Sequence, residues 1–240
     1  MCSGRVDLEF ILRAFLNGQD GVFIGGCRLN ECNYITHGNY DALNIVLLCR
    51  KIMEHIGLNP ERLSIQFMSS GEGILFTEVV DDFSKKVKAL GPLGKGENRD
   101  ADELKSKLAE VRKLIPYIKI VKRKKLESRL ENEKEYDGLF TSDEMDRLFS
   151  EAVSYYIDPD NCQACMICAK RCPVEAIAGG KNLIHVIDQD TCIKCGTCFD
   201  VCPPRFGAVK KFSGEPVPPP IPEEERTIVR KSKKTVADKT

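Results

Sequence analysis

The sequence predicts two folded domains joined by a helical connector: an α/β domain with a parallel sheet at residues 1–94, and a small cysteine-rich α+β domain at residues 154–210. Three observations predict this arrangement. In the first domain, stretches with helical apolar spacing alternate with short apolar runs, which is typical of helices packed around a parallel sheet. The connector, residues 95–153, is highly charged and has one narrow apolar stripe. Eight of the 12 cysteines then crowd into about forty residues.

The N-terminal domain is expected to contain three helices and two strands. Apolar residues recur at helical spacing in three stretches, and they run together or alternate in two short ones. The predicted elements are helices over residues 8–16, 45–56 and 76–90, and strands over residues 22–24 and 63–67. Gly57 and the pair Gly91-Pro92 mark the ends of the second and third helices, because glycine and proline stop helices.

Two strands are few for a parallel sheet that must cover three helices. The sequence has Cys2 and a predicted helix at its start, with no predicted strand before them. We therefore expect that a strand precedes this segment in the complete domain, and that the N-terminal domain is truncated. Functional loops usually follow the ends of parallel strands, and the loop that holds Cys27 follows the first predicted strand.

The charged connector is predicted to be helical. Its first helix has a narrow apolar stripe that needs a partner surface, and Pro116 is expected to interrupt it. The stripe consists of Leu104, Leu108, Val111, Ile115 and Ile118. A second amphipathic helix opens with a capping signal at residues 141–144 and leads into the cysteine-rich domain. Residues 211–240 form a tail rich in proline and charge, predicted to be extended, and either solvated or wrapped around a partner.

Composition and charge argue against several classes of function. The chain has 36 basic and 36 acidic residues, so its net charge is zero and gives no overall electrostatic attraction to nucleic acid. The basic cluster at residues 119–125 is followed at once by glutamates, and we interpret it as a solvated helix face rather than a nucleic-acid site. No apolar run reaches the ~18 residues that cross a bilayer, and no signal peptide begins the chain. The sequence thus predicts a cytoplasmic protein without membrane insertion, whose cysteines stay reduced.

The cysteine-rich domain contains one four-cysteine pattern twice. Each run reads CxxCxxCxxxCP, and the runs comprise Cys162, Cys165, Cys168 and Cys172, then Cys192, Cys195, Cys198 and Cys202. Three thiolates at this spacing wrap a short loop around three irons of a 4Fe-4S cubane, and the fourth cysteine of each run ligates the other cluster. The pattern therefore assigns Cys162, Cys165, Cys168 and Cys202 to a first 4Fe-4S cluster, and Cys192, Cys195, Cys198 and Cys172 to a second.

This pattern resembles the bacterial two-cluster ferredoxin module, and the domain is therefore expected to be ferredoxin-like. A pair of zinc sites is the alternative, although zinc usually takes two CxxC pairs separated by a longer loop. Two iron–sulfur clusters pass single electrons and offer no open metal site, base or nucleophile, so the module is expected to transfer electrons without transforming a substrate. We interpret His185 as a packed or surface residue, because all eight thiolate positions are filled.

Three further cysteines, Cys2, Cys27 and Cys32, lie in loops at the ends of predicted elements, which are suitable places for ligands. The glycines that precede Cys27 let the backbone approach a cluster closely, because a residue without Cβ tolerates positive φ. Cys49 lies on the apolar face of a predicted helix and is interpreted as core.

The N-terminal segments carry a second resemblance. The similar segments are CSGR at Cys2, GC(x4)C with Tyr34, Gly38-Asn39-Tyr40, residues 69–73 and the ending Leu90-Gly91-Pro92. Over residues 1–94 they resemble the delta subunit of the methyl-viologen-reducing hydrogenase, which joins a hydrogenase or another dehydrogenase to heterodisulfide reductase. The resemblance implies a 2Fe-2S cluster held by Cys2, Cys27, Cys32 and an upstream cysteine-rich segment, so the site is incomplete in this sequence. Alternatively, the three cysteines remain in a domain that serves only for docking.

Together the two resemblances imply an iron–sulfur electron-transfer subunit. It would relay electrons between a hydrogenase, a formate dehydrogenase or an NADH dehydrogenase and a heterodisulfide reductase-like complex. We expect a non-catalytic subunit, since GxGxxG, Walker and HExxH motifs are absent from the sequence. Two other classes stay open: a self-contained oxidoreductase that uses Cys27 and Cys32 as a thiol pair, and a regulatory protein that senses cluster loss.

Overall fold

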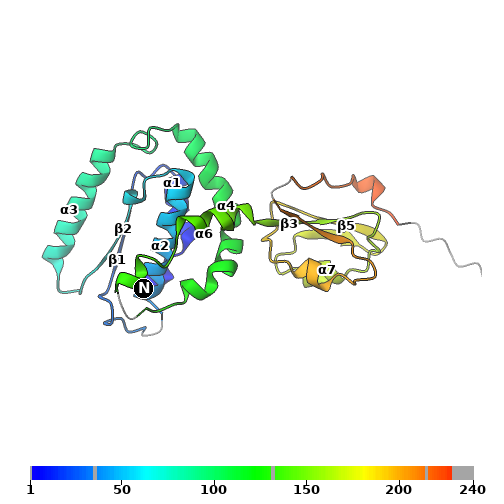
Figure 1. Cartoon of the computed structure of the whole chain (residues 1–240), viewed down its shortest axis with the longest axis horizontal. Helices are drawn as coiled ribbons and strands as arrows, with labels where there is room; N and C mark the ends of the chain where they lie inside the picture. The colour runs from blue at the N-terminus through cyan, green and yellow to red at the C-terminus, as the bar shows by residue number, and fades with distance from the viewer. Residues whose placement is uncertain (1, 35–36, 131–132, 214–215, 229–240) are drawn as a thin grey trace, which may run out of the picture. The chain divides into compact units, whose positions relative to one another are not determined.

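The computed structural model describes residues 2–34, 37–130, 133–213 and 216–228. The chain forms two compact units, Met1–Ser150 and Glu151–Thr240 (Figure 1). Each unit has its own cluster of buried apolar side chains. No helix in the described segments is long and apolar enough to span a membrane. The end of the predicted tail, residues 229–240, lies outside the described residues.

The first unit combines a parallel pair of strands with helices. Its described elements are η1 (Ser3–Arg5), α1 (Leu8–Leu16), β1 (Val22–Gly26), α2 (Asn39–Ile56), η2 (Pro60–Arg62), β2 (Leu63–Phe67), α3 (Gly73–Leu90), α4 (Ala101–Leu126), α5 (Glu133–Tyr136) and α6 (Ser142–Ser150). β1 pairs with β2 in parallel, from Val22 opposite Leu63 to Gly26 opposite Phe67. The predicted parallel sheet is thus confirmed, and in the described part of this unit it has two strands.

Local sequence explains where the first helices begin and end. The Asp7 side chain accepts a hydrogen bond from the Glu9 amide and caps α1. α2 begins at Asn39, well before the predicted start at residue 45, because Gly38 turns the chain into the helix with a φ of 87°. It ends where Gly57 adopts the left-handed conformation, as the sequence predicted.

The predicted interruption of the connector helix at Pro116 is wrong, because α4 runs from Ala101 to Leu126 without a break. Proline removes one backbone hydrogen bond, but buried residues on both sides of it hold the helix in place. The apolar stripe of α4 packs against α1 and α2, which supply the partner surface that the stripe needs. At the end of the helix, the Asn44 side chain donates hydrogen bonds to the carbonyls of Leu126 and Ser128.

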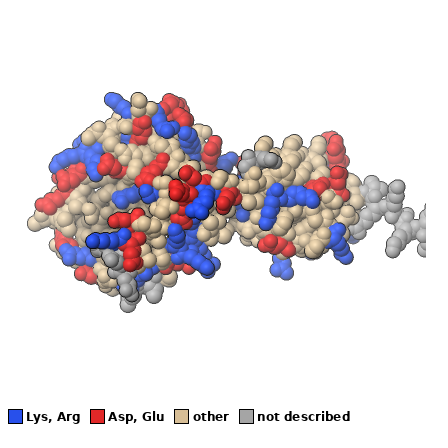
Figure 2. Space-filling view, viewed as in Figure 1, with Lys and Arg blue, Asp and Glu red and all other residues tan. Residues whose placement is uncertain are grey.

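The basic cluster on α4 is only partly the solvated face that the sequence predicted, because Arg123 and Lys124 are exposed but the other lysines form ion pairs. Lys122 is buried and pairs with the Glu144 carboxylate of α6 at 2.6 Å, and Lys125 pairs with the same carboxylate at 2.8 Å. Lys119 forms an ion pair with Asp7. These ammonium groups join α4 to its neighbours, and the attraction is strongest for Lys122 and Glu144, because that pair is the one largely shielded from water. Elsewhere on the visible face of this unit, basic and acidic side chains are interspersed (Figure 2).

α3 is only partly packed. None of its side chains is buried, although the sequence predicts an apolar face. Phe83 lies near the sheet, with its ring centroid 5.7 Å from that of Phe23 in β1. At the N-terminal end, Ile74 is 79% exposed and Phe76 is also exposed. The apolar face of α3 therefore contacts the sheet through its C-terminal half.

Arg62 anchors the connection between α3 and α4. Its side chain is fully buried, and its guanidinium donates hydrogen bonds to the two carboxylate oxygens of Glu97 at 2.6 and 3.1 Å. It also donates to the carbonyls of Asp20, Gly91 and Pro92. Burial takes both charges out of water, so this complete set of partners is what makes the pair tolerable inside the protein.

The second unit is built from two matching halves. Its described elements are β3 (Val153–Ile157), α7 (Ile167–Arg171), β4 (Ile177–Gly180), β5 (Leu183–Ile187), α8 (Thr197–Val201), β6 (Val209–Ser213) and η3 (Glu223–Glu225). β3 pairs antiparallel with β6, and β4 with β5. An offset of 30 positions relates β3 to β5, α7 to α8 and each cysteine of the first run to one of the second.

Residues 226–228 of the predicted tail lie along β5 of their own unit. The Ile184 amide donates to the Arg226 carbonyl at 2.7 Å, and the Ile228 amide donates to the Asn182 carbonyl at 2.8 Å. Thr227 forms an antiparallel bridge with Leu183. The predicted start of the tail is wrong for residues 211–213, which belong to β6, and the predicted extended conformation is wrong for residues 223–225, which form η3. Residues 226–228 pair with β5 of the same chain.

Candidate functional site

The thiols of the second unit form two groups, and each group combines both cysteine runs. In the first group, burial raises the pKa of Cys168 to about 11, with further contributions from the neighbouring thiols of Cys162, Cys165 and Cys202. The fourth member, Cys202, belongs to the second run. The structure thus brings together the four residues that the pattern assigns to the first cluster.

The second group surrounds a cavity beside α8. This cavity is lined by Cys172, Cys192, Cys195 and Cys198 together with apolar side chains and Tyr155. Burial raises the pKa of Cys198 to about 12, with further contributions from Cys192 and Cys195. Burial also raises the pKa of Cys192, which has Cys195 and Cys172 as close neighbours. Here too, three thiols of one run meet the fourth thiol of the other.

The chemistry of these groups fits a metal cluster. Buried thiols with raised pKa values are poor nucleophiles, whereas a bound metal cation keeps coordinating thiols deprotonated. Iron–sulfur clusters are held by sets of four cysteine thiolates, which matches the composition of each group. In the described residues, no three His, Cys, Asp or Glu side chains lie close enough together to hold a single metal ion.

The loops that carry the thiols curl tightly. Ala164, Met166 and Lys194 adopt positive φ without being glycine, and Gly196 has a φ of 81°. In the second loop, this conformation lets the Lys194 amide donate a hydrogen bond to Cys192 Sγ at 3.4 Å. Backbone amides that face sulfur stabilise a thiolate, so the loop conformation supports ligand chemistry at these cysteines.

His185 is buried beside the first group. Its Nδ1 lies 3.8 Å from Cys162 Sγ, and its Nε2 lies 3.2 Å from Met166 Sδ. The interpretation of His185 as a packed residue is thus confirmed, whereas its contact with the Cys162 sulfur does not follow from the sequence pattern used above. The spacing of the repeat could have indicated it, because His185 follows Tyr155 by 30 positions, and Tyr155 lines the second group.

The three N-terminal cysteines lie together between β1 and the start of α2. Cys2 Sγ and Cys32 Sγ are 3.8 Å apart. The backbone amides of Tyr34 and Asn39 donate hydrogen bonds to Cys32 and lower its pKa, and Cys27 and Cys2 also hydrogen-bond to it. Burial raises the pKa of Cys27, as does its hydrogen bond with Cys32. Cys32 is thus the central thiol of this set, which we call the N-terminal thiol cluster.

Two residues that belong to the family-like segment Gly38-Asn39-Tyr40 hold the loop of the N-terminal thiol cluster. Asn39 donates hydrogen bonds from Nδ2 to the carbonyls of Cys27 and Arg28 at 2.8 and 2.7 Å. Gly38 packs against the sulfurs, since a Cβ there would lie 2.6 Å from Cys32 Sγ and 3.3 Å from Cys2 Sγ. Cys49 is separate from this cluster. It is buried in the core of the unit, as predicted, and burial raises its pKa.

We expect Gly38→Ala to disrupt the N-terminal thiol cluster. Alanine at this positive φ is strained by about 1–3 kcal/mol, and its methyl group would displace the Cys32 sulfur. The free energy of unfolding of the first unit in urea should fall, and the yield of a Cys2–Cys32 disulfide under mild oxidation should change. Gly71→Ala is the matched control, because nothing lies within 4 Å of a Cβ there. Equal stability and equal disulfide yield in the two variants would contradict this expectation.

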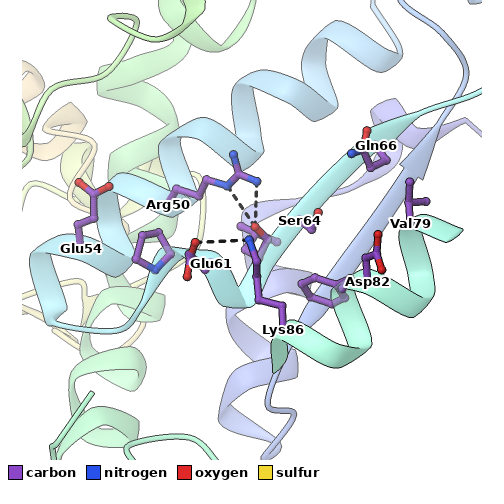
Figure 3. A pocket seen from close by; sticks show the side chains of 11 residues that line it. Arg50, Glu54, Glu61, Ser64, Gln66, Val79, Asp82 and Lys86 are labelled. Carbon is purple, nitrogen blue, oxygen red and sulfur yellow. Dashed lines mark hydrogen bonds and ion pairs between the residues drawn. The ribbon is translucent and has the colours of Figure 1, made fainter. Parts of the chain in front are cut away.

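One cavity of the first unit is separate from all the cysteines. It has a volume of about 500 Å³ and lies between α2, β2 and α3. In Figure 3, Arg50 bonds the Leu63 carbonyl at one side of it, and Lys86 pairs with Glu61 at 3.4 Å. Its lining contains no thiol, so we assign it no part in metal binding.

Comparisons with known proteins match the two units to different families. Residues 1–91 match the family of the methyl-viologen-reducing hydrogenase delta subunit, and residues 161–206 match the 4Fe-4S dicluster domain. An iron–sulfur subunit of the F420-non-reducing hydrogenase of Archaeoglobus profundus is 45% identical over 91 residues, which are 38% of this chain and 66% of the relative. A subunit of the ferredoxin/F(420)H(2)-dependent CoB-CoM heterodisulfide reductase of Methanosarcina acetivorans is 43% identical over 94 residues, which are 39% of this chain and 12% of the relative.

A further relative is similar over a larger share of its length. The iron–sulfur subunit of the vhc F420-non-reducing hydrogenase of Methanococcus voltae is 41% identical over 98 residues, which are 41% of this chain and 67% of the relative. The recognised segments contain the N-terminal thiol cluster and the two thiol groups of the second unit. The chain therefore belongs to the family of methyl-viologen-reducing hydrogenase delta subunits, and it carries a 4Fe-4S dicluster domain at its C-terminal end.

Proposed function

We propose that the chain is an iron–sulfur electron-transfer subunit. It relays electrons between a dehydrogenase partner, such as a hydrogenase, a formate dehydrogenase or an NADH dehydrogenase, and a heterodisulfide reductase-like complex. One observation carries this proposal: eight thiols of the second unit form two groups of four, each completed by the fourth cysteine of the other run. The names of the relatives support the partners, because they are subunits of hydrogenases and of heterodisulfide reductase.

In this proposal the second unit holds two 4Fe-4S clusters. Cys162, Cys165, Cys168 and Cys202 hold the first, and Cys192, Cys195, Cys198 and Cys172 hold the second. Such clusters accept and release single electrons. The chain supplies thiolates, backbone amides aimed at sulfur, and apolar walls that limit the access of water. No substrate is transformed on the chain, so the catalytic chemistry belongs to its partners.

The N-terminal thiol cluster is the proposed site of a 2Fe-2S cluster in the first unit. Its three thiols, Cys2, Cys27 and Cys32, provide three of the four ligands that such a cluster requires. The lowered pKa of Cys32 favours the thiolate form, which is the form that binds metal. The first unit would also provide the docking surface for a partner. We place the protein in the cytoplasm, where thiols stay reduced.

A second candidate function is thiol oxidoreduction at the N-terminal thiol cluster. It is favoured by the 3.8 Å separation of Cys2 Sγ and Cys32 Sγ and by the lowered pKa of Cys32. Oxidation of this pair to a disulfide would pass two electrons and two protons to a disulfide substrate, which becomes two thiols, and a supplied reductant would then restore the pair. Cys27 also hydrogen-bonds to Cys32, so the Cys27 and Cys32 pair that the sequence suggests stays open beside the Cys2 and Cys32 pair. This candidate predicts turnover of a disulfide substrate without any partner protein.

Metal analysis tests the proposed function. After anaerobic purification of the full chain, we expect about eight irons with matching sulfide, and an EPR signal of two coupled 4Fe-4S clusters after reduction. About ten irons with an additional 2Fe-2S signal would support a filled N-terminal site. Stoichiometric zinc with little iron would overturn the electron-transfer function altogether.

A further inference from the structure

His185 lies between two sulfur atoms in the second unit, and the function proposed above gives it no task. The residue is 1% exposed. Its two ring nitrogens face Cys162 Sγ and Met166 Sδ, at 3.8 and 3.2 Å. Buried polar groups normally have hydrogen-bond partners, and these two sulfurs are the ones that the structure offers to the imidazole.

The internal repeat shows that the two thiol groups have different neighbours. Tyr155 stands at the position that matches His185, and it lines the cavity of the second group. The residues beneath the two rings also match: a Cβ on Gly196 would lie 2.8 Å from the Tyr155 hydroxyl, whereas Met166 contacts His185. In one half the large ring of Tyr155 therefore lies over Gly196, and in the other half the smaller ring of His185 lies over Met166. Only the first group has an imidazole at this position.

Packing fixes the orientation of the imidazole. Gly179 lies so close to the ring that a Cβ at this position would collide with it. A neutral imidazole has a single N–H, and its other ring nitrogen is an acceptor. A thiolate that ligates a metal is an anionic acceptor, and it competes for this N–H better than a neutral thioether does. The proton is therefore expected on Nδ1, facing Cys162.

We propose that His185 donates a hydrogen bond from Nδ1 to the Cys162 thiolate, and that this bond raises the reduction potential of the first cluster above that of the second. The inference rests on the proposed function, because it requires a cluster at each thiol group. One-electron reduction adds one negative charge, breaks no bond and transfers no proton. Hydrogen bonds to ligand sulfurs stabilise that added charge, so His185 makes the first group the preferred place for a single electron.

The test is an EPR-monitored redox titration of the full chain, purified anaerobically and reduced with dithionite. His185→Phe removes the N–H and keeps a ring. At a fixed ambient potential, the ratio of reduced to oxidised first cluster should fall about tenfold, which corresponds to ~59 mV for one electron. His185→Asn places an amide N–H near the position of Nδ1 and should restore most of the ratio. Tyr155→Phe, the matched control in the other half, should leave the first cluster unchanged.

Iron content separates the possible outcomes. The proposal is supported if both variants keep the full iron content, if His185→Phe lowers the potential of the first cluster, and if His185→Asn restores that potential. An unchanged potential in His185→Phe overturns it, and so does an equal loss in both variants, since that would indicate a packing effect. The potential that remains in a Cys172→Ala chain identifies the first cluster. Absence of iron from the unaltered chain would instead overturn the proposed function, and with it this inference.

Discussion

Replacing Cys202 by alanine is expected to remove the cluster of the first cysteine run, although Cys202 belongs to the second run. The reason is the exchange of fourth thiols: Cys202 lies beside Cys168 in the first group. Iron should fall from about eight to about four atoms per chain, and the magnetic coupling between the clusters should disappear from the EPR spectrum. Iron analysis and EPR of the anaerobically purified variant measure both effects.

A set of matched variants makes this result decisive. Cys165→Ala should leave the same surviving cluster as Cys202→Ala, with the same EPR spectrum and potential. Cys195→Ala and Cys172→Ala should both show the EPR spectrum of the other cluster, the one that Cys202→Ala removes. Cys49→Ala removes a core thiol of the first unit, and it should retain all the iron. If the spectrum of Cys202→Ala instead matched that of Cys195→Ala, the exchange of ligands between the two runs would be refuted.

Glu97→Ala is expected to lower the free energy of unfolding of the first unit by about 3–5 kcal/mol, because it leaves a buried guanidinium without its counter-charge. Arg62 has no exposed surface and the Glu97 side chain is 3% exposed. Glu97 also accepts hydrogen bonds from the amides of Asn59 and Gly94. Urea unfolding of the full chain, followed through a probe in the first unit, measures the loss.

The control for Glu97 is another glutamate that forms an ion pair at the surface. Glu61 pairs with Lys86 at 3.4 Å, and its side chain is 56% exposed. Because water screens such pairs, Glu61→Ala should cost less than about 1 kcal/mol. Equal losses for the two alanine variants would mean that the buried pair contributes no more to stability than the surface pair.

Acid pH is expected to weaken the ion pair between Arg62 and Glu97. Burial alone would raise the pKa of Glu97, but the hydrogen bond and charge of Arg62, together with the amides of Asn59 and Gly94, outweigh burial and hold the pKa below its usual value. A carboxylate with a lowered folded pKa stabilises the protein above its unfolded pKa, and the stabilisation is lost as the pH falls through the folded value. In Glu97→Gln, the unfolding free energy should therefore depend less on pH in the acid range.

The sequence predicts most of the second unit, because ligand spacing constrains it directly. Three thiols two residues apart can meet around one centre only if the loop curls, and the repeat places the same loop twice. Pro116 and Lys122 are different, since their environment depends on the surface that α4 meets. An isolated helix would break at the proline and solvate the lysine, whereas packing against α1 and pairing with Glu144 reverse both outcomes.

The N-terminal thiol cluster, too, could be predicted only in part from the sequence. Glycine and cysteine spacing places Cys27 and Cys32 in one loop after a strand, which the structure confirms. Which thiols touch depends on where the chain crosses itself, and local patterns do not specify that Cys2 approaches Cys32 from the other end of the loop. The interpretation of His185 as a packed residue is confirmed, but its contact with Cys162 was not predicted, for the same reason. A lone histidine carries no local signal, and its meaning emerged from its partner position in the repeat.

The C-terminal segment that lies along β5 has a consequence for association between molecules. A strand with unpaired amides and carbonyls is a template on which another chain can extend a sheet, and natural proteins commonly cover such edges. Here the amide of Ile184 and the carbonyl of Asn182 are occupied by residues 226–228 of the same polypeptide. Residues 226–228 therefore occupy this part of the β5 edge, which leaves it closed to pairing with a strand of another molecule.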